Sequence, residues 1–273
     1  MRAAFFDLDK TVIAKASIVA FGGSFRRGGL VTRRLMVRAV ISQLIYLQFG
    51  ADEARLARVR ETMLALTAGW ERDRVRQIVR DTLLETIEPI IYAEALELIE
   101  EHRRQGNRVY LVSAAPEEIV LPLVELLGVD GAIASRGEID EEGRYTGRLA
   151  FSAQGEHKAE AMRDLAGRAG FSLEESTAYS DSATDLPMLE AVGHPVAVNP
   201  DRALAKVARE RGWEVRVFTK PVRLRDRFSV RTPVATTALA VLVAGLLLWR
   251  YGRRAGRRAA VASRLAVAAG APG

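Results

Sequence analysis

The chain has 273 residues, of which 49% are hydrophobic and 27% are charged, a balance typical of a folded globular protein and not of a disordered one. It contains no cysteine, so disulfide bonds, zinc–thiolate sites and cysteine nucleophiles are excluded. The net charge is +6, and arginines cluster within residues 26–38 and 250–258. These clusters match no nucleic-acid-binding module, and we expect no nucleic-acid partner.

Short apolar runs predict buried strands at residues 3–6, 108–114, 177–181, 195–199 and 214–218. The runs are continuous, which is typical of parallel strands that helices cover on both faces. Helical patterns separate them, at residues 89–106, 115–128, 157–170, 183–193 and 201–212. This alternation predicts an α/β fold with a doubly wound, Rossmann-like parallel sheet. A β-hairpin over residues 137–151 is expected as a small appendage.

About 100 residues separate the first two predicted strands, whereas an ordinary crossover unit needs roughly 30. The catalytic core is expected to comprise residues 1–13 and 89–218, which leaves residues 14–88 as an insert with a helical pattern. Ligands of doubly wound sheets bind beyond the carboxyl ends of the strands, and the insert begins at such an end. We interpret it as a helical cap, with a decorative subdomain as the alternative. Its glycine-rich stretch, 22–29, lacks the phosphate-loop pattern and is interpreted as a hinge or turn.

The C-terminal part of the chain has a different composition. Residues 234–251 begin with sixteen uncharged, mostly apolar residues, and we expect a transmembrane or interfacial helix that anchors the protein to a membrane. A basic linker, 219–233, would join this helix to the core, and the basic residues 252–273 would form a disordered tail. Because acids arrive by position 7, the N-terminus does not resemble a secretory signal, and we expect a cytoplasmic catalytic domain.

Acidic side chains stand at the carboxyl ends of two predicted strands. Asp7 and Asp9 follow the first strand, and residues two apart in a strand point the same way, so both can face one crevice. Asp181 and Asp185 follow another strand. Buried carboxylates are tolerated when they share a cation, and Mg²⁺ suits a carboxylate cluster without histidine or sulfur ligands. Acids that merely cap turns are the alternative.

Two further groups are expected at the same crevice. Ser113 ends a third strand, where its hydroxyl and the neighbouring backbone N–H groups could hold an anion at a helix N-terminus. Lys158 begins another element and could supply positive charge. Acids, a hydroxyl and a lysine at strand ends favour phosphoryl transfer, because a carboxylate nucleophile needs a metal ion and a lysine to neutralise an incoming dianion.

The segments "FFDLDKT", "VSA", "EHKAEA" and "SDSATD" resemble the four motifs of the haloacid dehalogenase (HAD) superfamily. The helical insert after the first motif is similar to the caps of subfamily I, and the chain most resembles the phosphoserine-phosphatase-like branch, subfamily IB. The resemblance covers about residues 1–218. It implies a Mg²⁺-dependent phosphomonoester hydrolase that acts on a small phosphorylated substrate through an aspartyl-phosphate intermediate.

The resemblance also implies a role for each matching residue. Asp7 would be the nucleophile, and Asp9 the acid that protonates the leaving group and then the base that activates water. Ser113 and the backbone N–H of Ala114 would bind the transferring phosphate. Lys158 would hold Asp7 and the phosphate together.

The same resemblance implies that Thr11 supports the loop of the first motif. Mg²⁺ would be held by Asp7, the carbonyl of Asp9 and the carboxylate of Asp181, with Asp185 orienting the metal site.

The substrate is left open by the sequence. Phosphoserine phosphatases usually carry a glutamate that reads the substrate amine at the position of Ala16, and their fourth motif has an asparagine where this chain has Thr184. The candidates are a small metabolite such as phosphoserine, or a lysophospholipid or other lipid phosphate held near a bilayer. A catalytically silent, membrane-tethered regulatory module is a third alternative.

Overall fold

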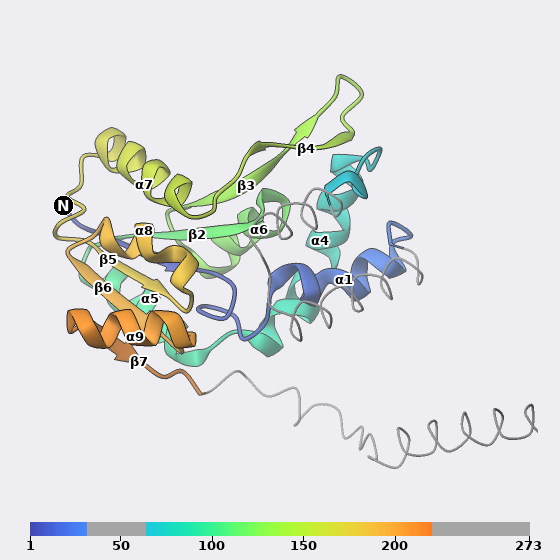
Figure 1. The fold of residues 1–273 in the computed structure, drawn as a ribbon. Coiled ribbons are helices and arrows are strands. Elements are labelled where there is room, and N and C mark those ends of the chain that lie inside the picture. The colour runs from blue at the N-terminus through green and yellow to red at the C-terminus, as the bar shows by residue number, and fades with distance from the viewer. Residues whose placement is uncertain (32–63, 220–273) are drawn as a thin grey trace, which may run out of the picture. The chain divides into compact units, whose positions relative to one another are not determined.

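The structure is a computed structural model that describes residues 1–31 and 64–219. Its strands are β1 (Ala3–Asp7), β2 (Arg108–Pro116), β3 (Gly131–Ile139), β4 (Tyr145–Phe151), β5 (Thr177–Ser180), β6 (His194–Val198) and β7 (Glu214–Arg216). The described strands form one seven-stranded sheet in the order β4-β3-β2-β1-β5-β6-β7 (Figure 1). Neighbouring strands pair in parallel except for β3 and β4, which form an antiparallel hairpin.

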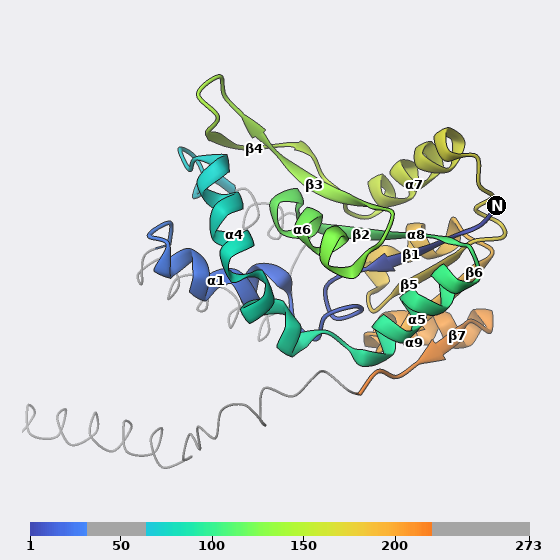
Figure 2. The same cartoon turned by 180° about the vertical axis from the view of Figure 1, so that it is seen from behind.

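Helices cover both faces of this sheet (Figures 1 and 2). On one face lie α5 (Ala93–Arg104) and α6 (Glu117–Leu127). On the other face lie α7 (Glu156–Ala169), α8 (Leu186–Glu190) and α9 (Arg202–Arg211). The predicted doubly wound α/β fold is therefore confirmed, and β1 lies in the middle of its sheet.

The two cores of the molecule meet at β1. Phe5 points into the core on the side of α7, where its ring stacks on Tyr110 at 5.7 Å between centroids. Phe6 points into the opposite core and stacks on Tyr179 at 4.3 Å. Both phenylalanines are completely buried, because successive residues of a strand face opposite sides and both sides are covered. The tight packing of β1 fixes the position of Asp7, its last residue.

The hairpin differs from its prediction in where it begins. The sequence predicts an appendage over 137–151, but β3 begins at Gly131 and pairs in parallel with β2 as a full member of the main sheet. The missed residues are small ones that give a weak apolar signal. A Cβ added at Gly131 would lie 3.4 Å from the ring of Tyr110, in van der Waals contact with it.

The described part of the predicted insert contains α1 (Ser17–Arg27) and α4 (Arg72–Ile87), which pack against each other beyond the carboxyl end of β1 (Figures 1 and 2). The expectation of a hinge or turn over 22–29 is wrong for its first part, because its first two glycines lie inside α1. Phe21 and Phe25, one turn apart, are buried and hold the helix in place, which outweighs the low helix propensity of glycine. The chain leaves the helix only at Gly28.

A second difference concerns the start of the helix predicted over 89–106. A short 3₁₀ turn, η1 (Glu88–Ile90), comes first, and α5 begins at Ala93. Between them Ile91 forms a β-bridge with Ile13, so the two connections between insert and core run side by side.

Two regions with sequence predictions lie outside the described residues. They are the middle of the predicted cap, 32–63, and the C-terminal part from residue 220 onwards, which includes the apolar segment 234–251. Within 1–31 and 64–219, no helix has both the length and the apolar character that crossing a membrane requires.

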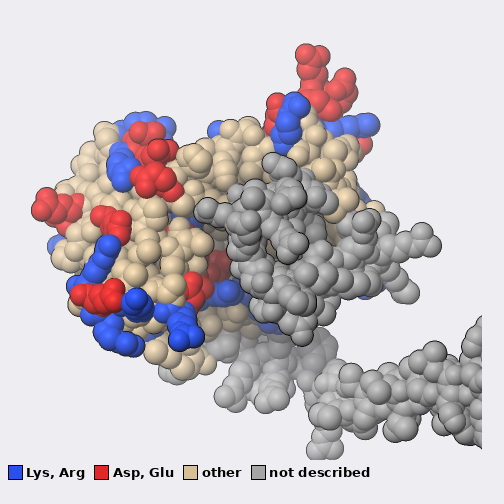
Figure 3. Space-filling model, in the orientation of Figure 1, with Lys and Arg blue, Asp and Glu red and all other residues tan. Residues whose placement is uncertain are grey.

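The surface over α7 and α9 carries charges of both signs (Figure 3). Within α7, Arg163 pairs with Glu156 at 2.9 Å, and within α9, Lys206 lies 3.8 Å from Glu210. Exposed pairs of this kind contribute at most about 1 kcal/mol each, so the stability of the fold rests on its two apolar cores.

The turn before β6 generates a prediction about stability. A Cβ added at Gly193 would lie 1.8 Å from the carbonyl oxygen of Glu174, so the backbone must move to accept any side chain. We expect Gly193→Ala to lower the free energy of unfolding by about 1–3 kcal/mol. Gly167→Ala in α7, where an added Cβ meets nothing within 4 Å, should instead raise it by about 0.5–1 kcal/mol. Urea denaturation measures both, and equal stability of the two variants would contradict the packing of this turn.

Candidate active site

A buried lysine joins two carboxylates at the carboxyl end of β1. The ammonium of Lys158 lies 2.7 Å from Asp7 Oδ1 and 2.8 Å from Asp185 Oδ2. The three side chains come from the end of β1, the first turn of α7 and the 3₁₀ turn η2 (Ala183–Asp185). All three are at least nine-tenths buried. Residues 151 and 27 positions apart in the chain therefore meet at one point, as the strand-end argument predicts.

Burial and charge act against each other in this cluster. Burial alone would lower the pKa of Lys158, but the Asp7 and Asp185 carboxylates outweigh it and raise the pKa above its usual value. Burial raises the pKa of Asp7, and the Lys158 ammonium opposes that rise. One buried cation thus faces two buried carboxylates, and the cluster has room for more positive charge.

Asp185 is held by a residue to which the sequence assigned no role. The hydroxyl of Ser180 donates a hydrogen bond to Asp185 Oδ2 at 2.7 Å, the same oxygen that contacts Lys158. Ser180 is the last residue of β5 and is completely buried. The spacing of five residues across a strand-to-turn junction is the only sequence signal for this contact. Its effect is to fix the carboxylate that holds the lysine.

Asp9 lies in the loop between β1 and α1, just before the insert. Its Oδ1 accepts a hydrogen bond of 2.8 Å from the backbone N–H of Ser17, the first residue of α1. Burial raises the pKa of Asp9, and the donors of Ser17 lower it. A carboxylate at a helix N-terminus is stabilised by the unpaired N–H groups and the helix dipole. The second acid of the first motif is therefore oriented by the insert and not by the sheet.

Asp181, which follows β5, approaches an exposed lysine. The ammonium of Lys10 is 4.0 Å from Asp181 Oδ2, and Lys10 has a positive φ of 64°. Burial raises the pKa of Asp181 to about 6, and Lys10 opposes the rise. Lys10 was not singled out from the sequence. Its position between Asp9 and Thr11 is the signal that it belongs to this loop.

Ser113, which belongs to the second motif, stands where the pairing of β2 with β3 becomes irregular. Its pairing with β3 shifts register between Ser113 and Pro116, so Ala114 and Ala115 fall in a bulge. The Ser113 hydroxyl accepts a hydrogen bond of 3.1 Å from the Ala115 N–H, and Ala114 is exposed. α6 begins at the next residues, and a helix N-terminus with a serine hydroxyl beside it suits an anion.

Thr11 is completely buried, and its hydroxyl has no hydrogen-bond partner among the residues that the structure describes. Its backbone N–H donates to the carbonyl of Leu8 at 3.4 Å. The Thr11 side chain thus lies inside the loop that follows Asp7 and carries Asp9, where it could support the loop by packing. Its hydroxyl makes no hydrogen bond to the described residues.

Arg72 connects the insert to the helix that follows Ser113. It is the first residue of α4, and its guanidinium pairs with Glu117 and with Glu118 in the first turn of α6. Glu118 is buried, so the pair with Arg72 supplies the positive charge that this carboxylate needs. One positive charge thereby offsets part of the negative charge of the two acids close to the expected anion site.

The family model of the haloacid dehalogenase-like hydrolases matches residues 4–190, which is more than half of the chain. The chain belongs to this family. The resemblance seen in its four motifs is therefore confirmed.

Curated relatives cover most of the chain. The "inhibition of morphological differentiation protein" of Streptomyces azureus is 48% identical over 92% of this chain and 94% of its own length. A probable phosphatase of Mycobacterium tuberculosis is also 48% identical, over 92% of this chain and 89% of its own. A phosphoserine phosphatase of the same organism is 35% identical over 92% of this chain and 82% of its own. The expectation of an HAD-type phosphatase is confirmed at this level.

Solved structures share the fold. A Bordetella pertussis protein described as having unknown function is 29% identical, with a TM-score of 0.68 over 79% of this chain and 97% of its own. A phosphoserine phosphatase solved as a phospho-aspartyl intermediate analogue is 21% identical, with a TM-score of 0.55 over 82% of this chain and 96% of its own. At that identity the second likeness shows the α/β fold alone.

The buried acids of the candidate active site have the donor chemistry of a magnesium site, but they do not by themselves form a complete set of metal ligands. Within 1–31 and 64–219, no three acidic or histidine side chains gather tightly enough to hold a metal by themselves. Mg²⁺ usually binds through one or two carboxylates, with water and substrate phosphate completing its shell, so this sparse set suffices. Asp7, Asp181 and Asp185 are buried carboxylates, and Lys158 is the one buried cation beside them in the described part of the chain. The excess negative charge fits a divalent cation.

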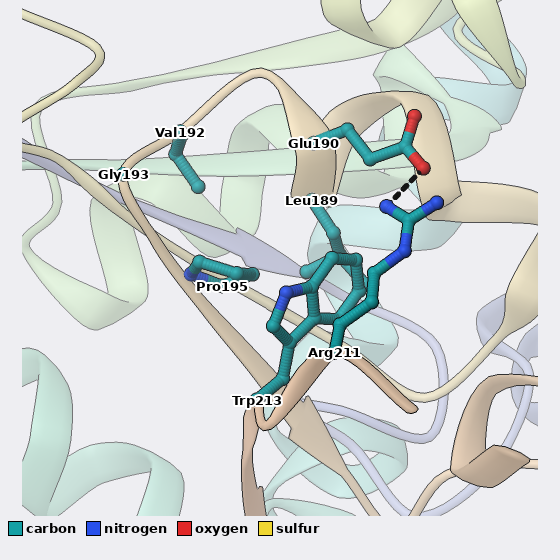
Figure 4. Close-up of a pocket in the computed structure, with 7 residues that line it drawn as sticks. All are labelled: Leu189, Glu190, Val192, Gly193, Pro195, Arg211 and Trp213. Carbon is teal, nitrogen blue, oxygen red and sulfur yellow. Dashed lines mark hydrogen bonds and ion pairs between the residues drawn. The ribbon is translucent and has the colours of Figure 1, made fainter. Parts of the chain in front are cut away.

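A surface pocket of about 460 Å³ lies at the other edge of the sheet (Figure 4). Its lining comes from the end of α8, the start of β6 and the turn before β7, whereas three of the four HAD motifs stand at the carboxyl ends of β1, β2 and β5. Arg211 lies 5.2 Å from the ring centroid of Trp213 and pairs with Glu190. These charges are already partnered, so the pocket is not part of the active site.

Without a metal ion, the excess of negative charge at the site should make the stability of the protein depend on pH. The raised pKa of Asp181 means that its contribution is fully present below about pH 4 and is lost as the pH rises through about 6. The variant Asp181→Asn has no carboxyl group at this position, so its stability does not fall in this way. In EDTA, the melting temperature of the variant relative to the parent should therefore increase between about pH 4.5 and about pH 8.

Differential scanning fluorimetry measures this difference, with a substitution at the exposed Asp164, Asp164→Asn, as the control. A difference for Asp181→Asn that stays constant or shrinks with pH would contradict the burial of this carboxylate.

Proposed function

We propose that this HAD phosphatase is a Mg²⁺-dependent phosphomonoester hydrolase that works through an aspartyl-phosphate on Asp7. The observation that carries the proposal is the 2.7 Å contact between Lys158 and Asp7 in a buried cluster at the carboxyl end of a central strand. Burying a carboxylate is unfavourable even when it is paired, so its presence at this point favours a chemical role. Burial raises the pKa of Asp7 to about 8, and the adjacent ammonium opposes the rise and favours the ionised form that attacks.

In the first step an Asp7 oxygen attacks phosphorus, a bond from Asp7 to phosphorus forms, and the bond from phosphorus to the ester oxygen breaks. Asp9 donates a proton to the departing oxygen, so that an alcohol leaves. The raised pKa of Asp9 keeps a protonated fraction available for this transfer.

In the second step Asp9, now a carboxylate, takes a proton from water as the water oxygen attacks phosphorus. The bond between phosphorus and Asp7 breaks, inorganic phosphate is released, and both acids return to their starting states. A single carboxyl group thus serves both steps, which is possible because the two proton transfers run in opposite directions.

The substrate phosphate would lie between Lys158 and the bulge after Ser113. The Ser113 hydroxyl and the backbone N–H of Ala114, at the N-terminus of α6, would bind its non-bridging oxygens. Lys158 would neutralise the charge that the phosphate and Asp7 share. Thr11, buried behind the acids, would support their loop.

Mg²⁺ would be held by the carboxylates of Asp7 and Asp181 and the carbonyl of Asp9. When bound, it supplies positive charge that stabilises the transferring phosphoryl group. In our proposal Asp185 acts on this site through Lys158, since its carboxylate contacts the lysine and Ser180.

The proposed substrates are small phosphorylated metabolites. Support comes from the relatives named phosphoserine phosphatase, at 35% identity, and histidinol-phosphatase of Neisseria meningitidis, at 30% identity over 98% of its own length. Both names refer to a phosphate ester of a small hydroxyl compound that also carries an amino group. Residues 32–63, which would complete the cap, lie outside the described part of the chain.

The proposal predicts that Asp7→Asn lowers phosphate release from O-phosphoserine or 4-nitrophenyl phosphate by at least about 10³-fold, because the amide is no nucleophile. Asp164→Asn on α7 should keep parental activity, and EDTA should abolish the parental activity until Mg²⁺ is restored. Malachite-green assay of released phosphate measures all of these.

Turnover that persists in Asp7→Asn would remove the mechanism, and a parent chain without turnover on any ester would support the catalytically silent module instead. Including histidinol phosphate and a lysophosphatidate in the assay separates small metabolites from lipid phosphates. A strong preference for the lipid would contradict the proposed substrate class.

A further inference from the structure

The two acids of the fourth motif are held in different ways. Asp185 is fixed by side chains, since Lys158 and Ser180 both contact its carboxylate. Asp181 has a looser contact, because its carboxylate lies 4.0 Å from the ammonium of the exposed Lys10, and an exposed pair of this kind contributes little. The direction of the Asp181 carboxylate therefore depends on the backbone of the loop that follows β5.

That loop is bound by one residue of a neighbouring turn. The N–H of Asp201, in the turn between β6 and α9, donates to the carbonyl oxygen of Asp181 at 2.7 Å. Oδ2 of the same residue accepts from the N–H of Ala183 at 3.0 Å and from the hydroxyl of Ser182 at 3.2 Å. The two turns are neighbours because β5 and β6 pair in parallel and end at the same edge of the sheet.

The other carboxylate oxygen of Asp201 caps a helix. Oδ1 accepts a hydrogen bond of 2.8 Å from the N–H of Leu204 in the first turn of α9. Asparagine and serine cap helices about as well as aspartate, so capping needs only one oxygen. The contacts of Oδ2 with the loop are what the cap does not explain.

The segment before Asp201 is itself fixed in place. Asn199 has a positive φ of 42°. Its side-chain amide accepts from the N–H of Phe218 at 2.9 Å and donates to the carbonyl oxygen of the same residue at 3.1 Å. Phe218 is buried in one of the two apolar cores. Asp201 thus projects from an anchored turn and can hold the loop after β5 in one position.

We propose that Asp201 is a positioning residue that sets the direction of the Asp181 carboxylate and thereby the affinity of the site for Mg²⁺. The inference rests on the proposed function, in which Asp181 binds this ion, and adds to it a residue that acts through the backbone of the loop. Residues that hold a metal ligand in place increase metal affinity, because the ligand is already oriented when the ion arrives.

The test measures Mg²⁺ affinity in two ways. Isothermal titration calorimetry gives the dissociation constant of the substrate-free protein, and hydrolysis of 4-nitrophenyl phosphate gives the Mg²⁺ concentration for half-maximal rate. We expect Asp201→Asn to raise both values at least about tenfold, the scale expected for losing a residue that orients a metal ligand. At saturating Mg²⁺, kcat should stay close to that of the parent. Neither value depends on how much of the variant is folded.

Matched variants separate the loop contacts from the helix cap. Asparagine at position 201 keeps an acceptor for the cap but replaces one oxygen with an amide group, which cannot accept from Ala183. Asp201→Ser also keeps a cap without a second oxygen, and it should behave like Asp201→Asn. Asp140→Asn is the control, because Asp140 accepts from the N–H of Arg144 at 2.8 Å in the exposed turn of the β3–β4 hairpin. It should leave both Mg²⁺ values unchanged.

Parental Mg²⁺ values in both Asp201 variants would overturn the positioning role and leave the proposed function intact. A lower melting temperature without a change in Mg²⁺ affinity would do the same, because it is the result expected for a helix cap alone. A parent chain that neither binds Mg²⁺ nor needs it for hydrolysis would refute the proposed function itself. The two failures are therefore distinguishable in one set of measurements.

Discussion

The contact between Lys158 and the carboxylates of Asp7 and Asp185 is the constraint around which the molecule is arranged. Charges buried this deeply are tolerated only when they are paired, and removing one partner of such a pair commonly costs about 3–5 kcal/mol. The fold therefore has to deliver the end of β1, the first turn of α7 and the turn after β5 to one place. The sheet order does so, because β5 lies next to β1 and α7 runs just before β5 in the chain.

The site combines groups of two kinds of origin. The sheet and the helices that cover it hold Asp7, the proposed nucleophile, with Lys158 and Asp185 in a closely packed, buried cluster. The insert holds Asp9, through the N-terminus of α1, and reaches the start of α6, the proposed anion site, through Arg72. In the proposed function the core thus supplies the nucleophile, and the insert orients the acid.

Much of this could be predicted from the sequence because strand-end residues obey simple geometry. Continuous apolar runs identify β1, β2 and β5, and the polar residues that follow them must meet at one edge of a parallel sheet. The convergence of Asp7 and Asp185 follows from that rule, whereas Lys158, in the first turn of α7, is not covered by it. The four motifs add the chemistry.

The parts that could not be predicted depend on packing and on partner choice. Glycine content suggests a turn before Gly28, yet the buried faces of Phe21 and Phe25 carry the helix through it. β3 begins early because small residues suffice beside Tyr110. The sequence singled out neither Ser180 nor Ser17, and only the folded chain shows that the Ser180 hydroxyl bonds to Asp185 and the Ser17 N–H to Asp9.

The central claim is that Asp7 becomes covalently phosphorylated during turnover. Rapid acid quenching of the protein with O-phosphoserine and Mg²⁺, followed by peptide mass spectrometry, tests it most directly. The account predicts a phosphoryl group on Asp7, in the peptide that contains β1, which disappears when the substrate is consumed. Release of inorganic phosphate with no phosphorylated Asp7 at any time during turnover would contradict it.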